Sequence, residues 1–311
     1  MVRTLSFGPR VAVLLAAFNG RPWLKTQIQS ILNQNGVDVS IFVSVDSSDD
    51  GTEALVLDLA RVDPRIMILP LGEHFGGAAR NFFRLIREVD VSAFEFVSLA
   101  DQDDIWYPEK LERAIHTLQL CSHDCYSSNV LAFWEDGRKS LIDKAQSQRN
   151  WDFFFEAAGP GCTYVLRRAV VEDLKMLIFS RSAEVAKVGL HDWFIYAFAR
   201  SRGYRWTIDP RATMSYRQHA ANQVGINAGW RAYRSRAIKI IAGWGISQAR
   251  LIARLIGLDN EPFCRPWRQP GRLGMLWLAL NADGARRKLS DRLTFAAACI
   301  FLAIVGDRSE E

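Results

Sequence analysis

Four short apolar runs, separated by segments of helical periodicity, occupy the first hundred residues. The sequence predicts strands at 11–16, 39–45, 65–69 and 94–100, and helices at 22–33, 52–62 and 77–89. Runs that are apolar on both faces are typical of a parallel sheet that helices cover on both sides. The alternation therefore predicts an α/β fold with a mostly parallel central sheet, whose ligands bind beyond the carboxyl ends of the strands.

The pattern changes after residue 104. Helices are predicted at 108–120, 168–177 and 191–201, strands at 126–134, 162–166, 205–208 and 213–216, and a polar loop at 138–150. From residue 230 onward helical patterns dominate, interrupted by Pro262, Pro266 and Pro270. We therefore predict an α/β domain over 1–229 and a helical C-terminal extension over 230–311.

The composition is that of a globular protein. The 311 residues are 49% hydrophobic and 23% charged, which excludes a disordered, collagen-like or coiled-coil chain. The five cysteines form no four-ligand zinc pattern, so we expect reduced thiols in a cytosolic protein. The apolar run near the N-terminus is short and lacks a cleavage site, so no signal peptide is predicted.

Basic residues are concentrated in the C-terminal extension. Residues 230–311 hold 14 Lys or Arg against 7 Asp or Glu, whereas residues 1–229 hold 25 against 27. A basic segment on an otherwise near-neutral chain favours an anionic partner. Nucleic acid and a membrane surface are the two candidates. No nucleic-acid partner is expected, because the extension carries no recognisable RNA- or DNA-binding motif.

The apolar run at 293–305, LTFAAACIFLAIV, has two interpretations. Its 13 residues are too few to span a bilayer, which takes about 20. It is either a packed core helix or a helix that lies at a membrane surface. Arg286, Arg287, Lys288 and Arg292 precede the run and support the second interpretation.

Three carboxylates follow the fourth predicted strand, in Asp101-Gln102-Asp103-Asp104. Carboxylates this close repel one another unless a cation compensates, and Mg²⁺ and Mn²⁺ prefer carboxylate oxygen. Asp101 and Asp103 are two residues apart, so on an extended strand end they face the same side. The alternative is a solvated acidic turn that caps the helix near Pro108, but the position at a strand end favours a ligand site.

A second polar segment, VDSSDDGT, follows the strand at 39–45. The carboxylate of Asp46 is placed to accept hydrogen bonds from a base or a ribose. The same residues also suit a turn in which Ser48 to Asp50 cap the next helix. The two interpretations are compatible, because the turn has several acceptors.

The ordered motifs together resemble a known family. They are AAFNG, QIQSILNQ, SVDSSDDGT, GGAARNFF, SLADQDDIWYPEKL, GPGCTYVLRR, LHDWFIYAFA and MSYRQHAANQVG, and they span about residues 11–225. This series resembles the inverting glycosyltransferases of family 2, and within them the branch that includes bacterial rhamnosyltransferases of O-antigen and capsule assembly. The resemblance implies a GT-A type nucleotide-binding fold over 1–229 and a nucleotide-diphospho-sugar donor.

The resemblance also assigns site residues on the donor side. Phe18 and Asn19 would line the nucleotide pocket, Asp46 would contact the base or ribose, and Gly76, Arg80 and Asn81 would lie near the donor. Asp101 and Asp103 correspond to the family's DxD pair, with Asp103 as the main ligand of a divalent metal, Mg²⁺ or Mn²⁺. Arg217 and His219 would approach the diphosphate or the metal. The family often has two acidic residues where this chain has Val45 and Asp46.

On the acceptor side, the resemblance makes Asp192 the general base. A carboxylate does this best when burial raises its pKa, and the apolar residues after Asp192 favour partial burial; the alternative is an ordinary helix N-cap. Gly161, Cys162 and Thr163 are expected to form a wall that the sugar approaches closely, with Cys162 a small buried residue. Trp193 either stacks on an acceptor sugar or packs in the core.

The predicted function is metal-dependent transfer of rhamnose from dTDP-rhamnose to a hydroxyl of a cell-surface polysaccharide precursor. The precursor would be carried on a polyprenyl diphosphate, and the enzyme would be cytoplasmic and peripheral to the inner membrane. A UDP-linked hexose or N-acetylhexosamine is the alternative donor. A non-catalytic nucleotide-sugar or glycan binding protein is the alternative function.

Overall fold

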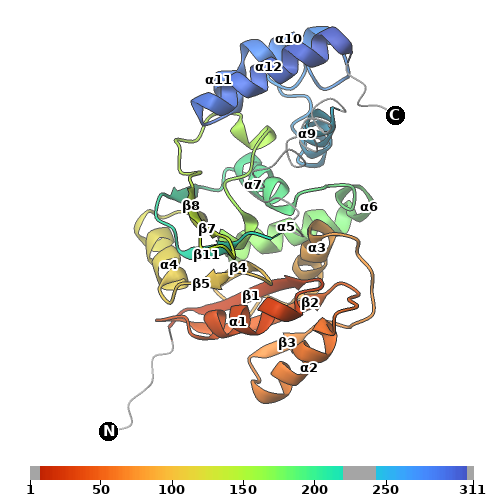
Figure 1. Ribbon diagram of the computed structural model, residues 1–311. Coiled ribbons are helices and arrows are strands. Elements are labelled where there is room, and N and C mark those ends of the chain that lie inside the picture. Colours follow the sequence, from red (N-terminus) through yellow and green to blue (C-terminus); the bar gives the residue numbers. More distant parts are fainter. Residues whose placement is uncertain (1–7, 220–242, 307–311) are drawn as a thin grey trace. The chain divides into compact units, whose positions relative to one another are not determined.

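The computed structural model describes residues 8–219 and 243–306 (Figure 1). It divides the chain into two compact units. The first comprises the described residues in 8–145, 159–182 and 204–219, and the second those in 146–158, 183–203 and 243–306. The predicted boundary between residues 229 and 230 lies outside the described residues.

A seven-stranded sheet forms the core of the first unit, in the order β10-β6-β9-β4-β1-β2-β3. The strands are β1 (Arg10–Ala17), β2 (Asp38–Val45), β3 (Ile66–Ile68), β4 (Phe96–Asp101), β6 (Cys125–Ser128), β9 (Val165–Arg167) and β10 (Trp206–Asp209). Four of the six pairings are parallel, and β9 runs antiparallel to β4 and β6. The predicted α/β fold with a mostly parallel sheet is confirmed.

Helices of the first unit cover this sheet. They are α1 (Arg21–Leu32), α2 (Thr52–Val62), α3 (Ala78–Glu88), α4 (Lys110–Leu120) and α5 (Arg168–Ser180), with the short turn η2 (Gly161–Thr163). Alternate residues of β1, such as Val13 and Leu15, share a core with Leu24 and Ile28 of α1. Pro22 stands in the first turn of α1, where its missing N–H costs no hydrogen bond.

A second, four-stranded sheet has the order β5-β11-β7-β8. Its strands are β5 (Ile105–Trp106), β7 (Val130–Phe133), β8 (Lys139–Ile142) and β11 (Met214–Arg217). The single strand predicted at 126–134 is wrong, because β6 and β7 belong to different sheets. Asn129 separates them, and its buried side chain donates to the carbonyl of Pro210 (2.8 Å) and accepts from the N–H of Lys144 (2.7 Å). The polar loop predicted at 138–150 contains β8.

The second unit is helical in its described part. It holds η1 (Asp152–Phe154), most of α6 (Ser182–Val185), α7 (His191–Ser201), α9 (Trp244–Leu255), α10 (Arg272–Leu280), α11 (Ala282–Ala285) and α12 (Leu289–Val305). The predicted helical character of the C-terminal segment is confirmed for residues 243–306. Within the described ranges, no helix combines the length and the apolarity that a membrane-crossing segment requires.

Candidate active site

Three parallel strands of the seven-stranded sheet end side by side. β1 lies between β2 and β4 and pairs with both in parallel. Phe18 and Asn19 follow β1, Asp46 follows β2 and Asp101 ends β4. The structure therefore brings together the residues that were predicted for the donor site at these three strand ends, in the zone where open α/β sheets bind ligands.

Asp46 organises the loop that precedes α3. Its buried carboxylate accepts hydrogen bonds from the backbone N–H groups of Phe75 (2.8 Å) and Gly76 (3.0 Å), and the exposed ring of His74 lies 3.2 Å away. Gly76 has φ +72°, a conformation that favours glycine. Arg80 is exposed and donates to the carbonyl of Phe75 (3.3 Å). Asp46 thus shapes the loop, and its contact with a base or ribose stays a prediction.

Two asparagines brace the strand ends. Asn19 donates its N–H to the Ser48 hydroxyl, and its side-chain oxygen accepts from the N–H of Asp49, each at 3.1 Å. Asn81 is buried in α3 and donates to two carbonyls near the ends of β1 and β2, at 3.3 and 3.1 Å. These bonds fix the loops after β1 and β2 relative to each other.

Gln102 joins the end of β1 to the acidic turn. Its side-chain amide accepts from the N–H of Phe18 (2.5 Å) and donates to the carbonyl of Phe18 (2.6 Å). Gln102 thus fixes the backbone of Phe18, and Phe18 is 48% exposed at the strand ends. This pairing was not predictable from the sequence, because the two residues are 84 positions apart.

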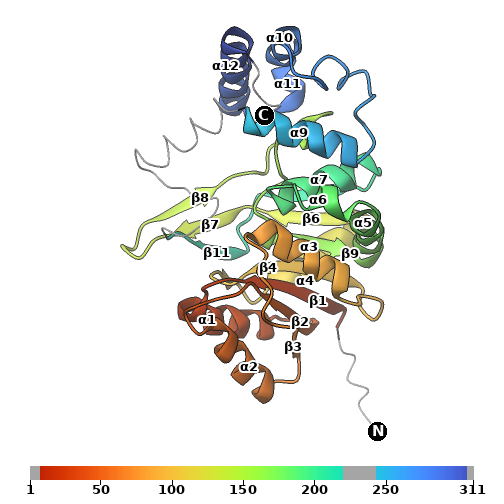
Figure 2. The ribbon, with the colours of Figure 1, turned by 90° about the vertical axis from the view of Figure 1, so that its right-hand side faces the viewer.

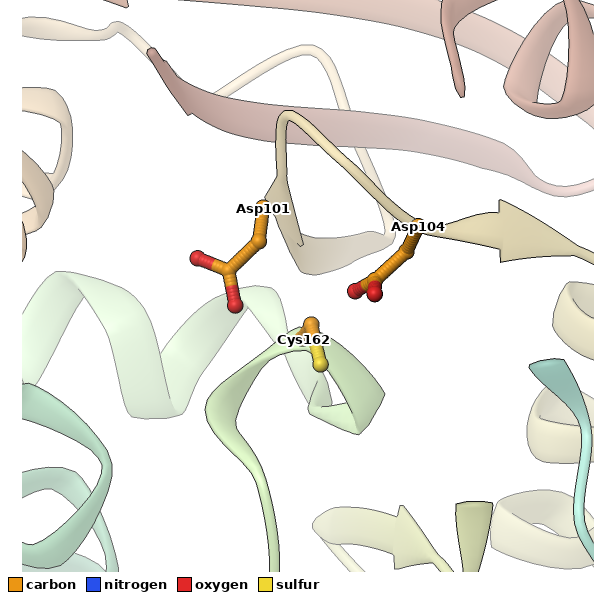
Figure 3. Close-up of side chains that lie close together, drawn as sticks. All are labelled: Asp101, Asp104 and Cys162. Atoms are coloured by element: carbon orange, nitrogen blue, oxygen red, sulfur yellow. The ribbon is translucent and has the colours of Figure 1, made fainter. Parts of the chain in front are cut away.

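The acidic turn carries a compact group of possible ligand atoms. Figure 3 shows the side chains of Asp101, Asp104 and Cys162 facing one another, with one ligand atom of each within 4.8 Å of the others. Burial, and then the charges of Asp103 and Asp101, raise the pKa of Asp104 well above its ordinary value. Burial also raises the pKa of Cys162, which hydrogen-bonds Asp104. Cys162 is therefore a protonated thiol, as expected of a small buried residue.

Asp103 and His219 form a second contact in the acidic turn. The Asp103 carboxylate lies 2.6 Å from Nε2 of His219, and both side chains are largely buried. The His219 ring stacks on Trp23 of α1, with centroids 4.2 Å apart. The structure thus brings together two of the three predicted metal residues, while the third, Asp101, faces Asp104.

Arg217, at the end of β11, holds the turn from the other side. Its backbone N–H donates to Asp104 (3.2 Å), and its Nε donates to the carbonyl of Asp103 (2.9 Å). The guanidinium lies 4.6 Å from the centroid of the Phe133 ring. Arg217 therefore adds positive charge beside the carboxylates, and its approach to the diphosphate or the metal stays a prediction.

The acidic turn fits a divalent cation. One oxygen of Asp104, Oδ2, is buried and accepts no hydrogen bond from the residues that the structure describes. Asp101, Asp103 and Asp104 also raise one another's free energy when all are ionised, and a cation removes that cost. Carboxylate oxygens suit Mg²⁺ and Mn²⁺, whereas the protonated thiol of Cys162 is a poor ligand for either.

Comparison with known proteins identifies the family. The family model described as Glycosyl transferase family 2 matches residues 12–174, more than half of the chain. The chain belongs to glycosyltransferase family 2. The matched range holds the three strand ends and the acidic turn, and the predicted family is confirmed.

Three proteins show how the chain relates to the rest of family 2. The dTDP-rhamnosyl transferase RfbG of Shigella flexneri is 42% identical over 90% of this chain and 96% of its own length. A Campylobacter jejuni protein, GalNAc(5)-diNAcBac-PP-undecaprenol beta-1,3-glucosyltransferase, is 32% identical over 38% of this chain and 36% of its own. The mannosyltransferase PcManGT of Pyrobaculum calidifontis, solved with GDP-Man and Mn²⁺, has a TM-score of 0.54 at 16% identity, covering 96% of this chain and 88% of its own.

The residue predicted as the base of this family 2 chain, Asp192, belongs to the second unit. It stands half-buried in the first turn of α7, where its carboxylate accepts from the N–H of Trp193 (2.7 Å). Trp193 is buried, and its indole donates to the carbonyl of Phe153 (2.9 Å). Trp193 was predicted either to stack on an acceptor sugar or to pack in the core, and its burial favours packing in the core of the second unit.

A buried ionic network anchors α7. Asp152 of η1 accepts from the hydroxyl of Tyr196 (3.0 Å) and from Arg200 (3.2 Å), both on α7. Arg287, between α11 and α12, lies 3.0 Å from Asp152 and 3.3 Å from Glu156. Tyr196 follows Asp192 by one helical turn, so this network fixes the helix that presents the predicted base.

The predicted acceptor wall is the turn η2 of the first unit. Gly161, Cys162 and Thr163 are buried, and the Thr163 hydroxyl donates to the carbonyl of Pro160 (2.7 Å). η2 contacts β4, which places Cys162 directly against the acidic turn. The close approach of a sugar to this wall stays a prediction.

Lys110 is a site residue that the sequence did not reveal. In the sequence it reads as an ordinary lysine at the start of a helix, yet it is fully buried, with Nζ 3.7 Å from the centroid of the Trp106 ring. Burial lowers the pKa of Lys110 to about 7, although the charge of Asp104 acts in the opposite direction. In its protonated form Lys110 offsets part of the charge of Asp104.

Acid is expected to destabilise this family 2 chain through His191. Burial lowers the pKa of His191 from 6.5 to about 3, so between these values the unfolded chain binds a proton that the folded chain does not. Stability therefore falls as the pH falls below 6.5, by about 2 kcal/mol from this group at pH 5. Urea unfolding at pH 7 and pH 5 measures the loss, and His191→Gln should reduce it by that amount. An equal loss in His191→Gln would contradict the assignment.

Proposed function

We propose that this chain is an inverting, metal-dependent glycosyltransferase that moves rhamnose from dTDP-rhamnose to a hydroxyl of a cell-surface polysaccharide precursor. The observation that carries the proposal is the acidic turn of Asp101, Asp103 and Asp104 at the end of β4, beside the ends of β1 and β2. The rhamnosyl part is supported by RfbG, the 42% identical relative whose name gives that donor.

The acidic turn would hold the divalent cation. Asp103 and Asp101 are its proposed ligands, with His219 beside Asp103 and Arg217 across the turn. When bound, the cation supplies positive charge to the donor diphosphate, which becomes more negative as it leaves. Mg²⁺ and Mn²⁺ both suit these oxygens, and the structural neighbour PcManGT was solved with Mn²⁺.

Asp192 would complete the chemistry as the general base. In an inverting transfer, the acceptor hydroxyl attacks the anomeric carbon from the face opposite the diphosphate. A bond forms to the acceptor oxygen, the bond to the diphosphate oxygen breaks, and the acceptor proton passes to the Asp192 carboxylate. The place of Asp192 in the first turn of a braced helix supports this role.

The acceptor is proposed to be a glycan on a polyprenyl diphosphate, with the enzyme peripheral to the cytoplasmic face of the inner membrane. The name of the Campylobacter jejuni relative includes PP-undecaprenol, which is a carrier of this class. The basic balance of residues 230–311 suits an anionic surface. A UDP-linked hexose or N-acetylhexosamine is the competing donor.

A thermal-shift screen tests the donor site. The chain is measured with dTDP-, UDP- and GDP-sugars, each with and without Mn²⁺ or Mg²⁺. Binding to the native state stabilises it by about 2.7 kcal/mol at a hundred times the Kd. We expect a metal-dependent shift with dTDP-rhamnose, reduced at least about tenfold in apparent affinity by Asp103→Asn.

Asp58→Asn is the matched control, because Asp58 is an exposed carboxylate on α2 of the same unit. It should leave the shift unchanged. A metal-dependent shift with UDP-sugars alone would show that the donor is a UDP-sugar and not dTDP-rhamnose. The absence of any shift would overturn the assignment of Asp46 and Asp103 to a donor site.

A further inference from the structure

Beyond its first turns, α12 lacks the polar residues that normally cover a surface helix, because residues 295–305 are FAAACIFLAIV. Leu293, Ile300 and Ile304 follow one another at helical spacing and are exposed, Leu293 by 66% and Ile304 by 70%. The inward face is also apolar, with Cys299, Leu302 and Ala303 buried. No charged residue lies in 293–306. A helix that is apolar all round is normally covered on every side.

α10 continues this apolar surface. α10 and α12 pack side by side within the second unit (Figure 2). Leu273, Leu276 and Leu280 share one face of α10, and Leu273 and Leu280 are 83% and 85% exposed. Of the 17 large hydrophobic side chains that are exposed in the described residues, nine lie on these two helices. Leu273, Leu276, Leu280, Leu293, Ile300 and Ile304 are called the apolar face below.

The charges around the apolar face indicate what covers it. Arg272 begins α10 and Lys288 precedes α12, and both are exposed. The described residues 243–306 hold 9 Lys or Arg against 4 Asp or Glu. An apolar helix face bordered by exposed cations is typical of a helix that lies in the interface of an anionic bilayer.

A second copy of the chain suits this surface less well. In a two-fold dimer the same surface meets itself, so the cations around one copy of the apolar face would meet those around the other. Like charges at such a contact are unfavourable, whereas anionic lipid headgroups would neutralise them. The charge pattern therefore favours lipid over a dimer.

We propose that the apolar face docks on the surface of a bilayer containing anionic phospholipids, with Arg272 and Lys288 at the headgroups. The helices lie in the interface and do not cross the bilayer. This inference rests on the proposed membrane location of the enzyme, and it names the surface and the lipid class.

Vesicle flotation of the full chain tests the proposal. Vesicles of phosphatidylcholine alone are compared with vesicles of phosphatidylcholine and phosphatidylglycerol in equal parts. The chain should float with the anionic vesicles and much less with the neutral ones. The double variant Leu293→Asn, Ile304→Asn should lower the partition coefficient at least about tenfold, because it removes exposed apolar contacts with the lipid. Arg272→Glu with Lys288→Glu should also weaken binding to the anionic vesicles.

The matched control is Met176→Asn with Phe179→Asn, which removes two exposed apolar side chains of α5 in the first unit. It should float like the parent. Failure of the parent to float, or equal flotation of the Leu293/Ile304 variant, would overturn the proposal. A parent dimer in sedimentation that becomes a monomer in this variant, without vesicle binding, would identify a second copy as the occupant. The donor-dependent thermal shift, measured on the same variants, shows that they are folded and reports on the donor site separately.

Discussion

Asp192→Asn is expected to reduce the rate of sugar transfer by about 10²–10⁴-fold while donor binding is retained. An amide has the shape of the carboxylate but cannot take the proton of the acceptor hydroxyl, and general-base catalysis contributes about this factor. The substitution leaves α7 in place, because the helix is held by Tyr196 and Arg200 through Asp152. Initial rates of product formation and the Kd of the donor, by calorimetry, separate the two effects.

Asp283→Asn is the control, since Asp283 is an exposed carboxylate in α11 of the same unit. It should leave both rate and donor affinity unchanged. Full turnover in Asp192→Asn would show that another group accepts the proton. A parent chain that binds the donor but forms no product with any acceptor tested would favour the non-catalytic binding protein.

The central sheet was predictable because its signal is local. β1 and β4 are largely apolar on both faces and almost fully buried, and β2 places a buried apolar residue at every second position from Val39 to Val45. These runs stand out in the sequence without reference to any partner. Asp46 and Asp101 then lie at the same edge of the sheet, one on each side of the end of β1, because β1 pairs in parallel with both β2 and β4. Where a strand is short and mostly exposed, as in β8, no such pattern exists, and the strand was missed.

The partners of the site residues were not predictable, because they come from distant parts of the chain. The pairing of Asp103 with His219 crosses 116 positions. Lys110 is buried against the ring of Trp106 in β5, a contact that no local pattern in the sequence predicts. The family resemblance identified Asp103 and His219 as site residues, whereas Lys110 and Gln102 could be recognised only in the folded structure.

The sequence pattern also could not predict which segments make up the second unit. A change of composition suggested a C-terminal extension, but the unit also includes residues 146–158 and 183–203. What joins these segments is the aromatic packing of Trp151 and Phe154 against Phe263, and the ionic network of Arg287. Such long-range contacts leave no periodic trace in the sequence.

Arg287→Met is expected to lower the free energy of unfolding by about 3–5 kcal/mol, the usual cost of breaking a buried ion pair from one side. Arg287 is fully buried, and it lies 3.0 Å from Asp152 and 3.3 Å from Glu156. Its backbone N–H also donates to Glu156 (2.6 Å), and its Nη2 donates to the carbonyl of Ala157 (2.6 Å). Without the guanidinium, two buried carboxylates lose their shared cation. Urea unfolding followed by circular dichroism measures the loss.

Two further variants test whether the loss of unfolding free energy in Arg287→Met comes from uncompensated charge. Arg265→Met removes an exposed arginine of the same unit and should cost less than about 1 kcal/mol. Glu156→Gln combined with Arg287→Met should recover part of the stability, because it removes one of the two buried carboxylates that have lost Arg287. No recovery would indicate that Arg287 acts through packing. Arg287 lies between α11 and α12 and binds Asp152, so this end of the chain is part of the framework that holds α7 and its Asp192.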